Sequence, residues 1–329
     1  MRVLLTRLSA LGDIVHTWPL AAALRGARPD LELYWLVERH FAPLVEAHPA
    51  VAGVIPVATR RWRTRWWSAA TRREVRDALA RLRELDLDVA LDPQGLVKSA
   101  AWARLARVPR RVGLAARQRR ERAAGLLYTT TVTPPPGASH VVDVNLSLAS
   151  ALGVVPEPGA APDGRFLLAG GTGPRPPAGA VVILPATGGP GKAWPPSCWA
   201  VTAAAVARLG HPVWVAWGPG ERALAEQIAV EAGVEIAPPT SIVELAHLLA
   251  GAAVVLGADT GTVHLAASIG VPTVAVFLAT DPGRNGPRGA RVAVVSAARG
   301  GARRGRARTG AAREVDPGEV LAALRELAG

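Results

Sequence analysis

The feature that most constrains this fold is a short apolar and β-branched run at Arg2–Thr6, which has a counterpart at Val181–Leu184. Neither run alternates with polar residues, which predicts a strand buried on both faces of a sheet. After each run, further strand patterns alternate with segments of helical spacing, as in a parallel α/β sheet. The expected fold is therefore α/β, with two doubly wound, Rossmann-like domains that face each other across a cleft.

Length and composition agree with two domains. The chain has 329 residues, which exceeds the usual size of one domain, and 50% of them are hydrophobic. Residues 153–180 are dense in Pro, Gly and Ala, so the boundary is placed there. We predict an N-terminal domain over 1–153, a linker over 154–180 and a C-terminal domain over 181–329. The last helix is a candidate to pack back on the N-terminal domain.

The remaining elements follow the same alternation. Further strands are predicted at 31–37, 51–57, 88–92, 110–114, 212–217, 253–257 and 272–277. Helices are predicted from Asp13 onwards and at 41–47, 70–84, 140–152, 196–209, 221–232, 242–250, 261–269 and 317–327. Loops are predicted at 60–67, 117–122 and 299–313.

Composition excludes several classes of protein. No apolar run approaches the ~20 residues of a membrane-spanning helix, and no targeting segment precedes the first strand, so an intracellular protein is expected. Cys198 is the only cysteine, which excludes a disulfide and a thiolate metal cluster. The net charge of +12 favours anionic partners or a negative membrane surface. Of the 38 Lys and Arg residues only Lys98 and Lys192 are lysine, which singles out these two positions.

The loop after the first strand carries an acidic residue where the helical spacing begins. Ser9, Ala10 and Gly12 are small enough for a tight turn, and the helix pattern starts at Asp13. By itself Asp13 is best interpreted as a helix N-cap. The alternative is a general base at the carboxyl end of a parallel strand, where open α/β sheets bind ligands. The loop lacks G-x-G-x-x-G and its carboxylate would repel a phosphate, which disfavours a nucleotide site.

Two further segments bring polar and basic groups toward the same edge. Gln94 and Lys98 follow a predicted strand and are placed facing the acidic loop, although a lysine there is more often a solvated surface residue. Residues 60–67 interleave four arginines with three tryptophans. Either the Trp rings fold inward, or the segment binds anionic headgroups or a phosphorylated or carboxylated ligand. Residues 117–122 form a second basic loop that is placed to join the first in one anion-binding wall.

A glycine-rich loop lies near the start of the second domain. Residues 187–195 contain one lysine, Lys192, and lead into a helix. Loops of this kind expose backbone N–H groups and add a point charge, which suits a phosphate. The alternative is a flexible turn, which leaves the scarce lysine unexplained.

A stronger signal lies at residues 258–265, where a buried strand leads into a short helix. Asp259 is expected as an acidic N-cap, and the amides of residues 260–263 can take a pyrophosphate. Because a carboxylate repels phosphate, Asp259 is better suited to sugar hydroxyls. His264 by itself is best interpreted as a core histidine with satisfied hydrogen bonds.

These motifs resemble those of the ADP-heptose glycosyltransferases of lipopolysaccharide inner-core assembly, glycosyltransferase family 9, over most of the chain. The S-x-x-G-D loop at 9–13 and the D-T-G-x-x-H loop at 259–264 are shared across that family. The segments at 94–100 and 60–63 favour the first heptosyltransferase over the second. Residues 188–191 and 278–282 depart from the family pattern.

The resemblance implies the GT-B arrangement, in which the N-terminal domain binds the acceptor and the C-terminal domain binds ADP-heptose. By that analogy Asp13 is the catalytic base and Lys192 is the catalytic group that contacts the diphosphate. The implied donor-binding residues are Thr187, Lys192, Glu221 (on the ribose hydroxyls), Thr240, Asp259, Thr260, Gly261 and His264. The implied acceptor-binding residues are Ser9, Gly12, Arg60, Arg61, Arg63, Gln94, Lys98 and Arg120.

The implied reaction is an inverting transfer of L-glycero-D-manno-heptose from ADP-heptose to a Kdo hydroxyl of Kdo-lipid A. Asp13 would remove the hydroxyl proton, and Lys192 with helix amides would stabilise the leaving ADP. No metal and no cofactor is expected to be required. The implied location is the cytoplasmic face of the inner membrane, with peripheral contact to its anionic surface. The alternatives are a related nucleotide-sugar transferase acting on a later core acceptor and a basic nucleic-acid-binding protein. No nucleic-acid partner is expected, because the arginines are spread over the whole chain.

Overall fold

The computed structural model describes residues 1–189, 191–297 and 314–328. These residues form two compact units, Met1–Ala160 and Ala161–Gly329. The division between Ala160 and Ala161 falls inside the segment 154–180 that the sequence predicts as a linker. The later part of that segment packs on the second unit, where the His247 ring lies 3.1 Å from the Gly170 carbonyl oxygen.

The described part of the first unit is built on a six-stranded parallel sheet in the order β3-β2-β1-β4-β5-β6. The strands are β1 (Arg2–Thr6), β2 (Glu32–Glu38), β3 (Val51–Val57), β4 (Val89–Asp92), β5 (Arg110–Leu114) and β6 (Thr130–Val132). The strand order reverses between β1 and β4, so the loops that follow these two strands leave the sheet side by side.

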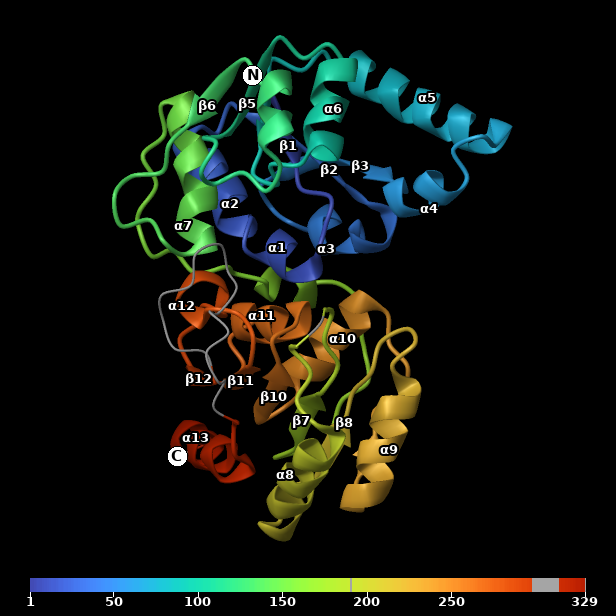
Figure 1. The fold of residues 1–329 in the computed structure, drawn as a ribbon, viewed down its shortest axis with the longest axis vertical. Helices are drawn as coiled ribbons and strands as arrows, with labels where there is room; N and C mark the ends of the chain where they lie inside the picture. Colours follow the sequence, from blue (N-terminus) through green and yellow to red (C-terminus); the bar gives the residue numbers. More distant parts are fainter. Residues whose placement is uncertain (190, 298–313, 329) are drawn as a thin grey trace. The chain divides into compact units, whose positions relative to one another are not determined.

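Helices cover both faces of this sheet (Figure 1). They are α1 (Leu11–Val15), α2 (Trp18–Ala27), α3 (Pro43–Glu46), α4 (Thr59–Thr64), α5 (Ala69–Glu84), α6 (Val97–Leu105) and α7 (Val141–Leu146). On one face, Trp62 of α4, Leu82 of α5 and Trp102 of α6 belong to one core cluster with Leu4 and Ala90 of the strands. Helices α2 and α7 contact each other on the opposite face.

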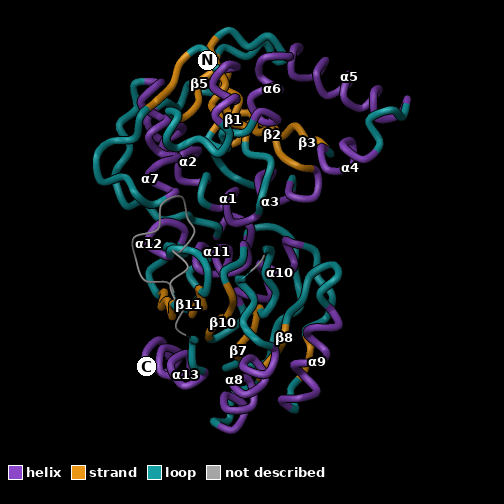
Figure 2. The backbone as a smooth tube through the Cα atoms, in the orientation of Figure 1, coloured by secondary structure: helices purple, strands orange, loops and turns teal. Residues whose placement is uncertain are grey.

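The second unit repeats this topology in its described residues, with a six-stranded parallel sheet ordered β12-β11-β10-β7-β8-β9. Four of these strands, β11, β10, β7 and β8, are labelled side by side in Figure 2. The strands are β7 (Val181–Leu184), β8 (Val213–Val215), β9 (Glu235–Ile236), β10 (Val254–Ala258), β11 (Thr273–Phe277) and β12 (Val292–Ser296). Counted from β7, the order matches that of the first sheet. Its reversal lies between β7 and β10.

The helices of the second unit are α8 (Pro196–Arg208), α9 (Arg222–Ala232), α10 (Ile242–Ala250), α11 (Gly261–Ser268), α12 (Pro282–Asn285) and α13 (Pro317–Ala328).

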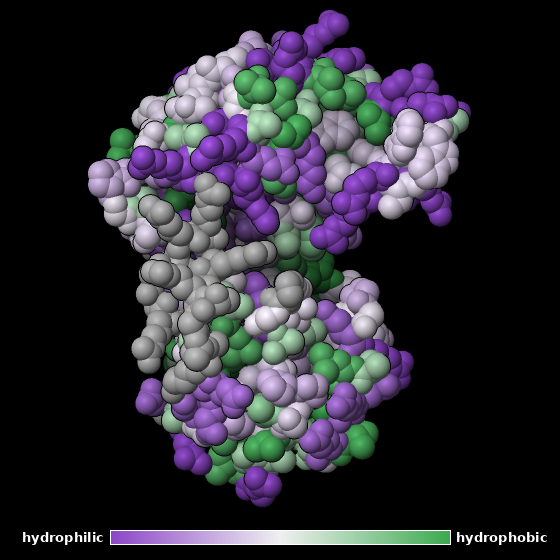
Figure 3. Space-filling view, in the orientation of Figure 1, coloured by the Kyte–Doolittle hydropathy of each residue, from purple (hydrophilic) through white to green (hydrophobic). Residues whose placement is uncertain are grey.

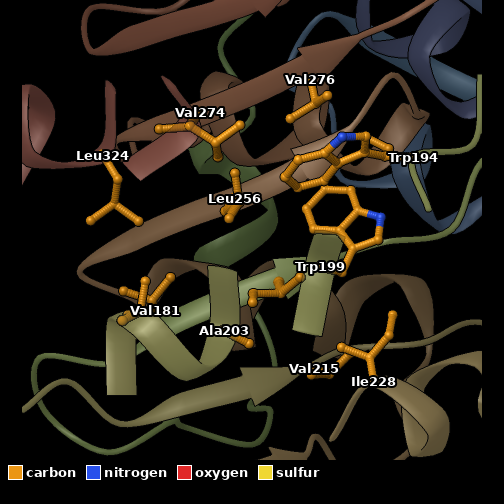
Figure 4. Packing of buried hydrophobic residues seen from close by; sticks show 14 of the residues in the cluster. Val181, Trp194, Trp199, Ala203, Val215, Ile228, Leu256, Val274, Val276 and Leu324 are labelled. Carbon is orange, nitrogen blue, oxygen red and sulfur yellow. The ribbon is translucent and has the colours of Figure 1, made fainter. Parts of the chain in front are cut away.

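Two tryptophans lie in the core of the second unit. The rings of Trp194 and Trp199 meet edge to face, with centroids 4.7 Å apart, and lie beside Leu256 of β10 (Figure 4). Trp194 Nε1 donates a 3.0 Å hydrogen bond to the Val315 carbonyl, which fixes the chain just after Lys192.

The last helix packs on the sheet and helices of its own unit, and its expected packing on the N-terminal domain stays a prediction. Val320 and Leu324 of α13 lie one helical turn apart, are 0% and 2% exposed, and belong to the second core cluster. Their apolar face completes the layer beside α8 and β12. Burying these side chains supplies the hydrophobic free energy that holds the helix there.

Three other local expectations need correction. Residues 60–67 are not a loop throughout, because residues 59–64 form α4, whose Trp62 packs 5.8 Å from the Trp102 ring. Residues 140–152 do not form one helix: α7 continues as a 3₁₀ segment, Ser147–Leu152, whose Ser147 and Ser150 hydroxyls bond to backbone carbonyls. Strands β6, β9 and β12 and helix α12 were not expected from the sequence. The predicted loop at 299–313 lies outside the described residues.

Candidate functional site

The strand-order reversal of the first unit holds a cavity of about 460 Å³. The loop after β1 and the loop after β4 form its floor, and α4 and the loop after β5 add basic side chains. Its lining residues are Ser9, Ala10, Asp13, Arg60, Gln94, Leu96, Lys98, Arg120 and Glu121. The predicted base is therefore brought together with five predicted acceptor residues. Gly12, Arg61 and Arg63 are not among the lining residues.

Asp13 is not the N-cap of α1, because that position belongs to Ala10. Asp13 is the third residue of the helix, and its Oδ2 accepts a 3.3 Å hydrogen bond from the Ala10 amide. Its side chain is 33% exposed, so the carboxylate is open to the cavity while its helix end remains satisfied. A carboxylate in this setting can receive a proton from a bound hydroxyl.

Arg7 lies behind Asp13 and was not anticipated from the sequence. Its guanidinium donates to Thr17 Oγ1 at 3.2 Å, the Pro93 carbonyl at 2.9 Å and Asn145 Oδ1 at 3.1 Å. Its Nη1 lies 3.9 Å from Asp13 Oδ2. Burial lowers the pKa of Arg7, and the charge of Asp13 works in the opposite direction. This fully buried cation ties the two cavity loops to α7.

Gln94 and Asp92 fix the loop after β4. Gln94 Oε1 accepts from the Leu8 amide at 2.9 Å, so Gln94 joins the two loops. Asp92 accepts from the Ser99 hydroxyl at 2.7 Å and the Tyr128 hydroxyl at 2.8 Å. Burial raises the pKa of Asp92, while these hydrogen bonds favour its ionised form. Gln94 is only 3% exposed, which makes it more a positioning group than a free ligand.

Basic groups at the cavity come from three separate elements. Lys98 is exposed in the first turn of α6, and Arg60 and Arg120 lie on α4 and on the loop after β5. Both predicted basic segments therefore contribute to one wall. Arg60 also borders a second cavity of about 340 Å³, which Arg61 lines as well. Glu121, the acidic residue of the first cavity wall besides Asp13, accepts a 2.7 Å hydrogen bond from the Val97 amide.

The strand-order reversal of the second unit brings together two predicted donor residues, Lys192 and Asp259. Lys192 Nζ lies 2.6 Å from Asp259 Oδ2, and their side chains are 25% and 6% exposed. The Thr280 hydroxyl also donates to Asp259 Oδ2. Asp259 is not an N-cap, because Thr260 holds that position and makes no side-chain bond to the helix. Asp259 instead holds Lys192, which buries the carboxylate with a partner.

The other predicted donor residues follow neighbouring strands at the same sheet edge. Thr187 follows β7, and Gly261 begins α11 after β10. Glu221 follows β8 and accepts from the Gly218 amide at 2.8 Å, and Thr240 follows β9. His264 is 6% exposed, as expected for a core histidine. In the described part of the chain, no group of three or more His, Cys, Asp and Glu side chains is arranged to hold a metal ion.

Comparison with known proteins decides the family. The sequence profile of glycosyltransferase family 9 (heptosyltransferase) matches residues 75–310. The chain belongs to this family. It is 37% identical to lipopolysaccharide heptosyltransferase 1 of Pseudomonas aeruginosa over 88% of this chain and 82% of that protein. It is 35% identical to the protein of the same name from Escherichia coli K12, over 91% of this chain and 94% of that protein.

Solved structures of the family share the fold. The E. coli heptosyltransferase WaaC with ADP superposes with a TM-score of 0.85 at 32% identity, and the match covers 100% of both chains. An E. coli ADP-heptose heptosyltransferase II shares the fold with a TM-score of 0.75 at 20% identity. The expected pair of Rossmann-like domains of the GT-B type is confirmed. So is the resemblance to the first heptosyltransferase, since the curated relatives carry that name.

Two residues of the candidate sites in this heptosyltransferase were not predicted from the sequence. Arg7 directly follows β1, and Thr280 lies in the loop after β11. Arg7 follows the strand that leads into the predicted acidic loop, and Thr280 follows the strand next to β10 in the sheet. This position at the carboxyl end of a site strand is the signal that could have identified both residues. In the described residues, no helix is both long and apolar enough to cross a bilayer.

Proposed function

We propose that this chain transfers L-glycero-D-manno-heptose from ADP-heptose to a Kdo hydroxyl of Kdo-lipid A, a step in building the lipopolysaccharide inner core. The observation that carries this proposal is Asp13 in a cavity also lined by Arg60, Lys98 and Arg120. Such a cavity suits an acceptor that is itself anionic, as a carboxylated sugar on a phosphorylated lipid is. The names of the relatives, lipopolysaccharide heptosyltransferase 1, support a heptose as the transferred sugar.

Asp13 is the proposed general base. It takes the proton of the acceptor hydroxyl as that oxygen forms a bond to the anomeric carbon of the heptose. The bond between this carbon and the diphosphate oxygen breaks, ADP leaves with the electron pair, and the configuration inverts. The basic groups around the cavity hold the acceptor anions and orient the hydroxyl.

Lys192 and the first turn of α11 are the proposed anion stabilisers. Charge accumulates on the diphosphate as ADP leaves, and an ammonium group with helix amides counters it. In this structure Lys192 pairs with Asp259, so binding of ADP-heptose must move the Lys192 ammonium group toward the phosphates. We propose that these groups make a metal ion unnecessary, and transfer is expected to continue unchanged in excess EDTA.

The proposed acceptor is a lipid, so the reaction is proposed to take place at the cytoplasmic face of the inner membrane. A transfer assay tests the whole assignment. It compares ADP-heptose, ADP-mannose, and UDP- and GDP-sugars as donors on Kdo-lipid A, on lipid A without Kdo, and on an acceptor that already carries one heptose. ADP-heptose with Kdo-lipid A is expected to react fastest. Preference for the heptosylated acceptor, or for a UDP-sugar, would overturn the proposal.

A further inference from the structure

The connection between α4 and α5 projects from the β3 edge of the first sheet (Figure 1). Its backbone is held by hydrogen bonds from the Arg65 amide to Trp62 and from the Ser68 amide to Arg65, of 3.2 and 3.0 Å. The Arg72 guanidinium donates to the Trp67 carbonyl at 2.6 Å. The tip therefore has a defined shape.

Two large aromatic side chains are presented at this tip. Trp66 and Trp67 are 69% and 63% exposed, and their rings meet edge to face with centroids 6.0 Å apart. Trp62, only four residues earlier, is 7% exposed in the core. Two indoles exposed to water do not contribute the free energy of hydrophobic burial to the fold. The outward pair is therefore suited to burial against a binding partner. An indole with an apolar body and an N–H group is typical of a bilayer interface.

The tip is strongly basic. Between Arg60 and Arg76 the chain has seven arginines and one acidic residue, Glu74. Arg61 pairs with that glutamate. The exposed arginines of this segment also include Arg63, Arg65, Arg72, Arg73 and Arg76. Hydrophilic and intermediate residues cover α4 and the start of α5 on the face in Figure 3. Clustered arginines beside aromatic rings complement an anionic lipid surface.

We propose that this tip, Trp66 and Trp67 with the arginines around them, docks the protein on a bilayer of anionic phospholipids. The indole rings enter the headgroup layer and the arginines contact lipid phosphates. Arg60 lies on the same short α4 and lines the cavity of Asp13, so docking presents that cavity near the membrane. The proposal rests on the proposed function in one respect, that the acceptor is a membrane lipid.

Vesicle flotation of the full-length protein tests this docking. The wild type is expected to float with equimolar phosphatidylcholine–phosphatidylglycerol vesicles and to stay behind with phosphatidylcholine alone. Trp66→Ser with Trp67→Ser should weaken binding by about tenfold or more. Replacing Arg65 and Arg73 with Gln should weaken it by roughly 20- to 30-fold. Val230→Ser is the control, because Val230 is 84% exposed on α9 beside acidic residues and should leave binding unchanged.

The same proteins are then assayed on a deacylated, water-soluble Kdo acceptor without vesicles. The Trp66→Ser, Trp67→Ser protein should keep wild-type turnover there, which also shows that it is folded. Vesicle binding that survives both double substitutions would overturn the docking proposal, as would binding of a single-stranded RNA in place of vesicles. A wild type that floats but transfers no heptose would instead contradict the proposed function alone.

Discussion

Arg7 Nη1 lies 3.9 Å from Asp13 Oδ2, with the guanidinium almost fully buried and the carboxylate one-third exposed. The arginine also bonds to Pro93 and Asn145, which are 86 and 138 residues away in the chain. One buried cation thus connects the proposed base to the second cavity loop and to α7.

Replacing Arg7 with Met should destabilise the protein by about 3 kcal/mol, because several buried acceptors lose a charged donor. Urea unfolding measures this loss. The matched control is Arg28→Met, which breaks a solvent-exposed pair with Asp30 and should cost far less stability than Arg7→Met. Equal losses for the two variants would show that Arg7 is not a buried connector.

Asp13→Asn should lower kcat by about 100- to 10,000-fold, since the amide cannot accept the hydroxyl proton. ADP affinity, measured by calorimetry, should stay at the wild-type level because the residue lies in the first unit. Near-normal turnover in this variant would remove Asp13 as the base.

Lys192→Ala should weaken binding of the ADP-sugar by about 10- to 150-fold, the loss of a charge-assisted hydrogen bond. Acceptor KM should change little. Thr280→Val, which removes only a hydroxyl that bonds to Asp259, should give a smaller donor effect. Equal weakening of donor and acceptor by Lys192→Ala would contradict the donor role.

Arg60→Ala should raise the acceptor KM by about tenfold or more, whereas Arg61→Ala should raise it less. The reason is that only Arg60 lines the cavity of Asp13, and Arg61 is paired with Glu74. Steady-state kinetics with a deacylated acceptor measure both, and exposed Arg81→Ala is the control. If Arg60→Ala affected the donor instead, the acceptor assignment would be reversed.

Glu74 links α4 to α5 and should make stability pH-dependent. Hydrogen bonds from Trp62 Nε1 and Arg61 lower the pKa of Glu74 below its ordinary value of 4.5. The stabilisation that ionised Glu74 gives to the folded protein is therefore present above pH 4.5. It is lost as the pH falls through the lowered pKa that Glu74 has in the folded state. The Tm of the wild type should exceed that of Glu74→Gln at neutral pH, and the difference should shrink in acid. A constant difference would contradict this link.

Local pattern was enough to predict most elements closely. The bounds of β1, β3, β5 and α10 agree with the expected ranges to the residue. Strand β1 is an apolar run with β-branched residues, and α10 is an amphipathic segment that follows the Ser241 cap, so short-range forces decide where these elements begin and end. Strand β9 has two residues and β6 has three, too short for a periodic signal.

The partners of polar groups were harder to predict. Asp13 and Asp259 both fit an N-cap pattern, but Ala10 and Thr260 hold those positions. Which atom a carboxylate meets depends on chain segments far away in sequence. Lys192 reaches Asp259 because β7 and β10 are neighbours in the sheet.

The sequence by itself determined the two α/β halves, the family and the edge of each sheet where chemistry is expected, because these follow from apolar runs and local motifs. Only the tertiary structure decided that Arg7 lies behind Asp13, that Asp259 holds Lys192, and that two of the three clustered tryptophans face outward. Buried charges must find partners, and the strand order that brings those partners together is a property of the packed sheet.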